Sequence, residues 1–218
     1  QSAKDPDAGI PDARKALEAV KPLFLDEDVV ELRAIAPGGP AASFCERIHD
    51  PAGFSRLQEF VRGHIADRNI YIGVNPRPTT FANTTRSARG SDVALRRNVV
   101  LDFDVKDAPA DDADWGKTLA AIRAACAPEL IVHTGNGVQI WVPVQGTSTA
   151  GETSLLQDTM QRLGADDMSD APRIARLPWT TNFPTRSKRE RGSVERLARP
   201  ISEAGLSARG RKPAEELC

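Results

Sequence analysis

The sequence predicts an α+β fold with a mixed or antiparallel sheet. Short β-branched segments alternate with amphipathic helical ones, and no long series of Val- and Ile-rich strands indicates a parallel βαβ sheet. A Thr-Gly-Asn-Gly turn between the apolar segments 130–133 and 138–144 predicts a hairpin, and therefore an antiparallel pair. With 218 residues, the chain is long enough for one large domain.

The first half of the chain is predicted to begin with a polar lead-in, residues 1–12, and then to form two helices and two strands. Asp50 and Pro51 mark one helix start, because Asp caps a helix and Pro fits its first position. The helices are expected over 13–21 and 51–65, and the strands over 29–36 and 69–74. The segment 75–90 that follows is polar and reads as too hydrophilic to be core.

The second half adds more strands and helices. Strands are expected over 98–104, 130–133, 138–144 and 193–197, and helices over 112–127 and 151–163. The apolar strand 98–104 ends in an Asp-x-Asp pair. Because side chains alternate along a strand, Val100, Asp102 and Asp104 share one face, opposite to Val99, Leu101 and Phe103. Two neighbouring carboxylates favour a divalent cation or a basic partner between them. The alternative is a strand that simply runs out into an acidic turn.

Composition indicates a soluble globular protein with 27% charged residues and a formal net charge of -1. The charge is uneven: residues 173–212 hold eleven Lys or Arg against three Glu, which hints at a polyanion partner. Three widely spaced cysteines form no disulfide framework, so a reducing compartment, the cytoplasm, is expected. No apolar segment approaches a membrane span. The chain begins at Gln1 and reads as a piece of a longer protein.

Two further segments contain candidate site residues that complement the Asp-x-Asp pair. The turn Thr134-Gly135-Asn136-Gly137 lets backbone N–H groups approach a phosphate, and Gln139 follows on the next strand, although an ordinary Asn-Gly hairpin is the alternative. The segment from Asp170 to Asn182 adds a carboxylate and two arginines. Carboxylates, a glycine turn and cations together are the components of metal-dependent phosphoryl transfer.

The order of these motifs resembles the archaeo-eukaryotic primase superfamily, and most of all the primase-polymerase and RepB-like primase domains of phages, plasmids and other mobile elements. The motifs are strand-Asp-x-Asp, then Thr-Gly-Asn-Gly-x-Gln, then Asp-x-x-Arg-x-x-Arg-Leu-Pro-x-Thr-x-Asn. The upstream segment from Tyr71 to Pro76 also looks like the Tyr-x-x-x-Asn-Pro segment of this group. The similarity runs from about Val29 to Arg191.

The resemblance implies a primase fold, with an RRM-like catalytic sheet and a smaller N-terminal α/β subdomain packed on it. It divides the chain into a lead-in over 1–25, a catalytic domain over 26–200 and a basic tail or linker over 201–218. The implied activity is a nucleotidyltransferase that synthesises short primers from NTPs or dNTPs on single-stranded DNA, with a helicase domain or protein as a further partner. Two Mg²⁺ or Mn²⁺ ions would be bound by Asp102, Asp104 and Asp170. Asp166 and Asp167 compete for the third position, and the spacing to the Arg-x-x-Arg-Leu-Pro segment decides for Asp170.

The same resemblance assigns the remaining candidate residues. Nucleotide contacts are expected from Thr134, Gly135, Asn136, Gly137, Gln139, Arg173, Arg176, Asn182 and Lys188. DNA contacts are expected from Arg77, Arg86, Arg96, Arg97, Arg186 and Arg189. Gln139 stands where the family usually has His, and Gln carries neither charge nor a proton to transfer. Trp179 stands where the family often has Gly, and either stacks on a base or packs.

Two other classes compete with this interpretation. A catalytically degenerate primase-like module would bind DNA without polymerising, and Gln139 favours that alternative. A different Asp-x-Asp metal enzyme, a glycosyltransferase or phosphohydrolase, would leave the segment 170–182 and the basic C-terminal stretch without a role.

Overall fold

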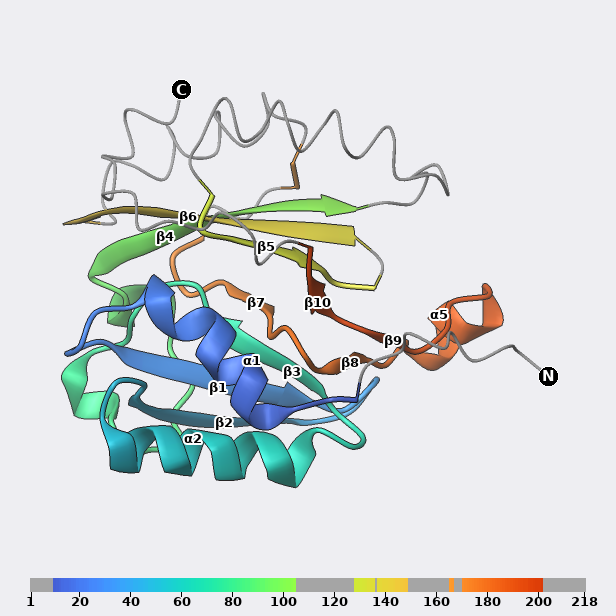
Figure 1. Ribbon diagram of the computed structural model, residues 1–218, viewed down its shortest axis with the longest axis horizontal. Coiled ribbons are helices and arrows are strands. Elements are labelled where there is room, and N and C mark those ends of the chain that lie inside the picture. The colour runs from blue at the N-terminus through green and yellow to red at the C-terminus, as the bar shows by residue number, and fades with distance from the viewer. Residues whose placement is uncertain (1–9, 105–127, 136, 149–164, 167–169, 202–218) are drawn as a thin grey trace.

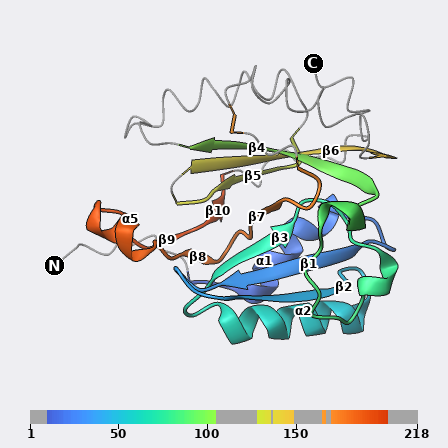
Figure 2. The same cartoon turned by 180° about the vertical axis from the view of Figure 1, so that it is seen from behind.

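The computed structural model describes residues 10–104, 128–135, 137–148, 165–166 and 170–201, and it has two four-stranded antiparallel sheets (Figures 1 and 2). The first sheet has the strand order β2-β1-β3-β7 and the second has the order β10-β5-β6-β4. A two-stranded ribbon, β8-β9, connects the end of β7 to β10. The α+β class with antiparallel sheets is therefore confirmed.

The first sheet carries the N-terminal helices. Its strands are β1 (Val29–Ile35), β2 (Ala41–Arg47), β3 (Asn69–Gly73) and β7 (Ile174–Arg176). The helices are α1 (Ala13–Val20), the 3₁₀ turn η1 (Lys21–Leu23) and α2 (Pro51–His64). Asp50 caps α2 by accepting from the Gly53 N–H at 2.6 Å, with Pro51 at the first position as expected.

Two features of this layer differ from expectation. Strand β2 was not predicted, because its short and polar residues gain strand structure only by pairing with β1. Residues 13–24, which the predicted boundary at 25 places in the lead-in, pack in the core: Leu17, Val20 and Leu23 are fully buried. A helix with a fully buried apolar face belongs to the domain rather than to a leader.

The second sheet holds the Asp-x-Asp strand. Its members are β4 (Leu95–Asp104), β5 (Leu130–His133), β6 (Gly137–Ser148) and β10 (Arg199–Pro200). Strands β5 and β6 form the predicted hairpin, and β6 pairs with β4 from Leu95 to Asp104, with a register shift between Arg96 and Asn98. The remaining elements are β8 (Thr181–Asn182), β9 (Arg196–Leu197) and helix α5 (Arg186–Glu190). The helices predicted over 112–127 and 151–163 lie outside the described residues.

The segment 75–93 covers a face of the first sheet, and the expectation that it is too hydrophilic to be core is wrong. It contains the 3₁₀ turns η2 (Thr79–Phe81) and η3 (Gly90–Asp92). Phe81 and Ala88 form a small buried cluster with Val29 and Cys45 of the sheet. A separate, larger core cluster joins α1, α2 and both sheets, so the two sheets share one hydrophobic core. Within the described ranges, no helix has the length and apolar character of a membrane span.

Candidate functional site

The candidate site lies where β4 and β6 run side by side. Asp102 is directly opposite Gln139, and Asp104 is opposite Gly137. Opposed residues of an antiparallel pair share a face, and Gln139 Nε2 donates to Asp102 Oδ2 at 3.3 Å. Asp102 is half-buried. The position of Asp104 follows from the backbone register alone, because its side chain is outside the described part of the structure.

A second aspartate reaches this strand from far along the chain. Asp166 forms an isolated antiparallel bridge with Asp102, and its N–H donates to the Asp102 carbonyl at 2.7 Å. The Asp166 residue is exposed, so its carboxylate is accessible beside Asp102. Asp170, by contrast, is exposed in a turn before β7 and forms an ion pair at 2.5 Å with Arg173 Nε.

The side chain of Gln139 is 6% exposed, and both ends of its amide are bonded. Gln139 Oε1 accepts from the backbone N–H of Arg176 at 2.8 Å, while Nε2 is directed to Asp102. Because the Arg176 N–H can only donate, it fixes Gln139 Oε1 on its side and leaves Nε2 to donate to Asp102. Gln139 therefore links β7 of the first sheet to the carboxylate of the second.

Arg176 is the centre of a buried polar network. Its guanidinium donates to Asn69 Oδ1 at 2.8 Å and to Tyr71 Oη and Asn182 Oδ1 at 2.9 Å, and it lies 4.3 Å from the centroid of the Tyr71 ring. Burial lowers the pKa of Arg176, and the negative charge of Asp102 acts in the opposite direction. With its donors bonded to neutral partners, Arg176 is a fixed positive charge behind the site.

The glycine turn is attached to the same network. The Asn182 amide donates to the Thr134 carbonyl at 2.9 Å, and Thr134 Oγ1 donates to the Gly137 carbonyl at 3.1 Å. Gly135 has a φ of 91°, and a β-carbon there would lie 2.9 Å from the β-carbon of Arg196. This backbone position therefore requires glycine. Asn136, the remaining turn residue, lies outside the described part of the chain.

Three arginines predicted to contact DNA are engaged inside the protein instead. Arg77 is 3% exposed and donates to Glu31 at 2.7 Å; burial lowers its pKa, which Glu31 raises. Arg96 is 2% exposed. Arg97, whose side chain is 14% exposed, forms ion pairs with Asp28 at 3.3 Å and Glu27 at 3.4 Å. The DNA-binding prediction is therefore wrong for Arg77 and Arg96, because buried guanidinium groups cannot reach a phosphate backbone.

The other predicted cations remain on the surface. Arg186, Lys188 and Arg189 are exposed on α5, which projects from the end of the molecule at which β4 finishes (Figures 1 and 2). Arg86 is exposed too, with its guanidinium 4.0 Å from the centroid of the Phe81 ring. The three cations on α5 therefore lie toward the carboxyl end of β4.

Sequence reasoning missed several residues that position the site. Asn75 is 1% exposed; its Oδ1 accepts from the N–H of Arg97 at 2.9 Å and of Asn98 at 3.3 Å. Asn98 in turn donates to the carbonyls of Leu23 and Val74. These bonds fasten β4 to the first sheet. The Tyr-x-x-x-Asn-Pro segment was the available signal, because it contains both Tyr71 and Asn75.

The donor set suits a hard divalent cation, because Asp102 on β4 and Asp166 in the segment bridged to it offer carboxylate oxygens. Among the side chains that the structure describes, no group of three His, Cys, Asp or Glu is close enough to bind a metal ion. Asp104 is not among those side chains, so two described carboxylates and one unplaced carboxylate form the candidate metal ligands.

No family model matches the sequence, and no curated protein matches it. Two solved structures are similar. The first is the AEP domain of the primase-polymerase of cyanophage S-2L, with a TM-score of 0.63, 16% identity, and coverage of 94% of this chain and 96% of that one. The second is the primase RepB′, with a TM-score of 0.55 and 16% identity over 94% of this chain; the match spans 60% of the RepB′ chain.

Proposed function

Because the chain has the fold of archaeo-eukaryotic primase domains, we propose that it is a primase-polymerase domain that synthesises short primers on single-stranded DNA from nucleoside triphosphates. The observation that carries the proposal is the alignment of Asp102 with Gln139 across β4 and β6, with the Asp166 bridge beside them. Carboxylates of Asp102 and Asp166 on this fold, next to a glycine turn, suit metal-assisted nucleotidyl transfer.

In this proposal, Asp102, Asp104 and Asp166 hold Mg²⁺ or Mn²⁺. We prefer Asp166 to Asp170 as the third carboxylate, because Asp166 pairs with Asp102 whereas Asp170 is neutralised by Arg173. When bound, the metals would lower the pKa of the attacking hydroxyl and stabilise charge on the phosphates. The chain's own part is to orient Asp102 through Gln139 and to keep Arg176 as a fixed positive charge behind it.

The incoming nucleotide would lie beside the turn 134–137 and the exposed Lys188, with the exposed Arg186 and Arg189 of α5 on the DNA. Arg176 and Asn182 act in this scheme by positioning, since both are buried and bonded to each other. We further propose that a helicase domain or protein acts together with this chain. The degenerate binding module stays a second candidate, because Gln139 is buried and uncharged, and its amide already bonds Asp102 and the Arg176 N–H, which leaves a single N–H for a phosphate.

The test is template-dependent incorporation of labelled nucleotides on single-stranded DNA with Mg²⁺ or Mn²⁺. Asp102→Asn/Asp104→Asn is expected to abolish product while DNA binding survives. Asp166→Asn and Asp170→Asn form a matched pair: the first is expected to lose activity and the second to keep it. Product from Asp166→Asn but none from Asp170→Asn would restore Asp170 as the third carboxylate. No product from the wild-type protein, with DNA binding intact, would favour the binding module.

A further inference from the structure

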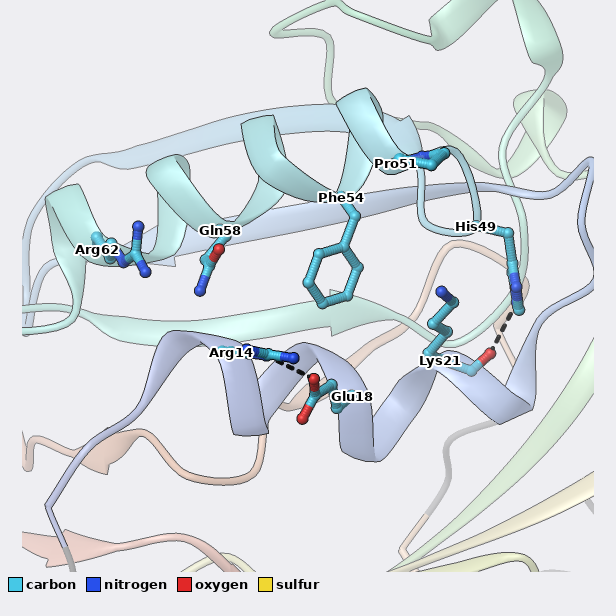
Figure 3. A pocket seen from close by; sticks show the side chains of 8 residues that line it. All are labelled: Arg14, Glu18, Lys21, His49, Pro51, Phe54, Gln58 and Arg62. Atoms are coloured by element: carbon cyan, nitrogen blue, oxygen red, sulfur yellow. Dashed lines mark hydrogen bonds and ion pairs between the residues drawn. The ribbon is translucent and has the colours of Figure 1, made fainter.

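A groove lies between α1 and α2 (Figure 3). Its volume is about 470 Å³, which is in the range of sites for small ligands. Figures 1 and 2 show α2 on the side of the β2-β1-β3-β7 sheet that faces away from the β4 sheet. The groove is therefore separate from the candidate site at Asp102.

The charge of the lining favours an anion. Arg14, Lys21 and Arg62 contribute three cations, against the single carboxylate of Glu18. Glu18 is paired with Arg14 at 2.7 Å, but the two side chains are 49% and 71% exposed, so the pair is weak. His49 Nε2 lies 3.1 Å from the Lys21 carbonyl and 3.0 Å from the Phe24 carbonyl. Because carbonyls only accept, this nitrogen carries a proton.

The cations are separated by an aromatic ring. In Figure 3, Arg14 and Arg62 lie toward one end of the groove, Lys21 lies toward the other, and Phe54 points into the space between them. Lys21 Nζ is 5.4 Å from the centroid of the Phe54 ring. Lys21 comes seven positions after Arg14, directly after the end of α1, which corresponds to roughly 10 Å along the helix axis.

This layout matches one nucleotide within a strand, which has a planar base flanked by a phosphate on each side. The half-buried Phe54 offers its groove-facing ring surface to the base when Lys21, which lies over the ring, turns to a phosphate. The cations at the two ends offer contacts for the two phosphates, and the Gln58 amide can donate to and accept from a base edge. A free mononucleotide has phosphate on one side only, and an acidic peptide makes no use of the ring.

We propose that the α1–α2 groove binds single-stranded DNA as a second contact, away from Asp102. The proposal takes the identity of the polymer from the proposed function, and it adds a site that the chemistry at Asp102 does not require. Template held at two places would stay bound during synthesis even when the contacts at the reacting end are broken.

The experiment measures the affinity of the full chain for a fluorescent oligothymidylate over a range of salt concentrations, without nucleotides or divalent metal. Each lost phosphate contact lowers the slope of log K against log salt by about 0.7, so Lys21→Gln/Arg62→Gln should weaken binding about 25-fold at about 0.1 M salt. Arg47→Gln/Arg89→Gln, which changes exposed arginines outside the groove and removes equal charge, should change little.

A variant that is expected to bind DNA more tightly serves as a second test, because a misfolded protein would lose affinity rather than gain it. Glu18→Gln frees Arg14 for a phosphate and should strengthen binding about fivefold, whereas Glu59→Gln, exposed on α2 but outside the groove, should not. An oligonucleotide containing 5-iododeoxyuridine should cross-link to the peptide that holds Phe54. Equal salt slopes for both double variants together with no cross-link at Phe54 would overturn the proposal.

Competition distinguishes the other occupants. Displacement of the cross-link by deoxythymidine monophosphate as effective as that by unlabelled oligothymidylate would mean a mononucleotide site, and more effective displacement by polyglutamate than by oligothymidylate would mean an acidic-peptide site. Either result refutes the proposal. Because binding is measured without metal, the Asp102→Asn/Asp104→Asn variant should bind at the groove normally. A negative result for DNA binding at the groove can therefore be distinguished from a negative result for primer synthesis.

Discussion

Replacement of Arg77 by Met tests whether this arginine is a structural residue or a DNA contact. The side chains of Arg77 and Glu31 are both fully buried, and Arg77 Nε donates to Glu31 Oε2 at 2.7 Å. Arg77 also donates to the carbonyls of Asn75 at 3.0 Å and Pro172 at 3.2 Å. It thus joins β1 to the segments that precede β4 and β7.

Removal of one partner of a buried ion pair costs about 3–5 kcal/mol. Arg33 still donates to Glu31 in the variant, which reduces the loss, while two carbonyls lose their donor, which increases it. We therefore expect the free energy of unfolding to fall by about 4 kcal/mol. For a chain of this size, that change lowers Tm by about 8–16 °C.

The assay is urea unfolding followed by circular dichroism, with the affinity for single-stranded DNA measured on the same samples. Arg86→Met, which changes an exposed arginine on the same segment, should cost less than about 1 kcal/mol. Glu31→Leu/Arg77→Met should be less destabilised than Arg77→Met alone, since the buried carboxylate is removed together with its buried partner. Arg33 also loses Glu31 in the double variant, but its side chain is 22% exposed and keeps its bond to the Ala88 carbonyl. Unchanged stability with weaker DNA binding in Arg77→Met would refute the buried ion pair.

Three further predictions concern single backbone or side-chain positions. Trp179 has a φ of 57°, so Trp179→Gly should be about 1 kcal/mol more stable than Trp179→Ala in urea unfolding, because only glycine avoids the strain of the left-handed region; the reverse order would contradict this backbone assignment. Gly135→Ala should destabilise by about 1–3 kcal/mol in the same assay, since its β-carbon would meet Arg196, and a neutral result would mean that the turn is not held against β9. Burial raises the pKa of Cys45 from 9.0 to about 12, so the unfolded chain releases the thiol proton first and stability should fall as pH rises through this interval; Cys45→Ala should lack that part of the pH dependence, and identical profiles would refute it.

Several features could be predicted from the sequence because short-range contacts determine them. The start of α2 depends on Asp50 and Pro51 alone, and the Thr-Gly-Asn-Gly turn by itself brings β5 and β6 together. The alternation of side chains placed Asp102 on the face opposite to Phe103. The motif order was sufficient to predict the fold that the two similar solved structures share.

The tertiary structure decided which charges face the solvent. Arg77 and Arg86 are arginines nine residues apart, yet Arg77 is buried and Arg86 is exposed. Arg77 can be buried because it pairs with Glu31, which lies 46 residues away in the chain and is brought beside it only by folding. Spacing favoured Asp170, whereas the bridge from Asp166 to Asp102 depends on how distant segments pair. Caps and turns are determined within a few residues, but the burial of a charge depends on partners brought together only by folding.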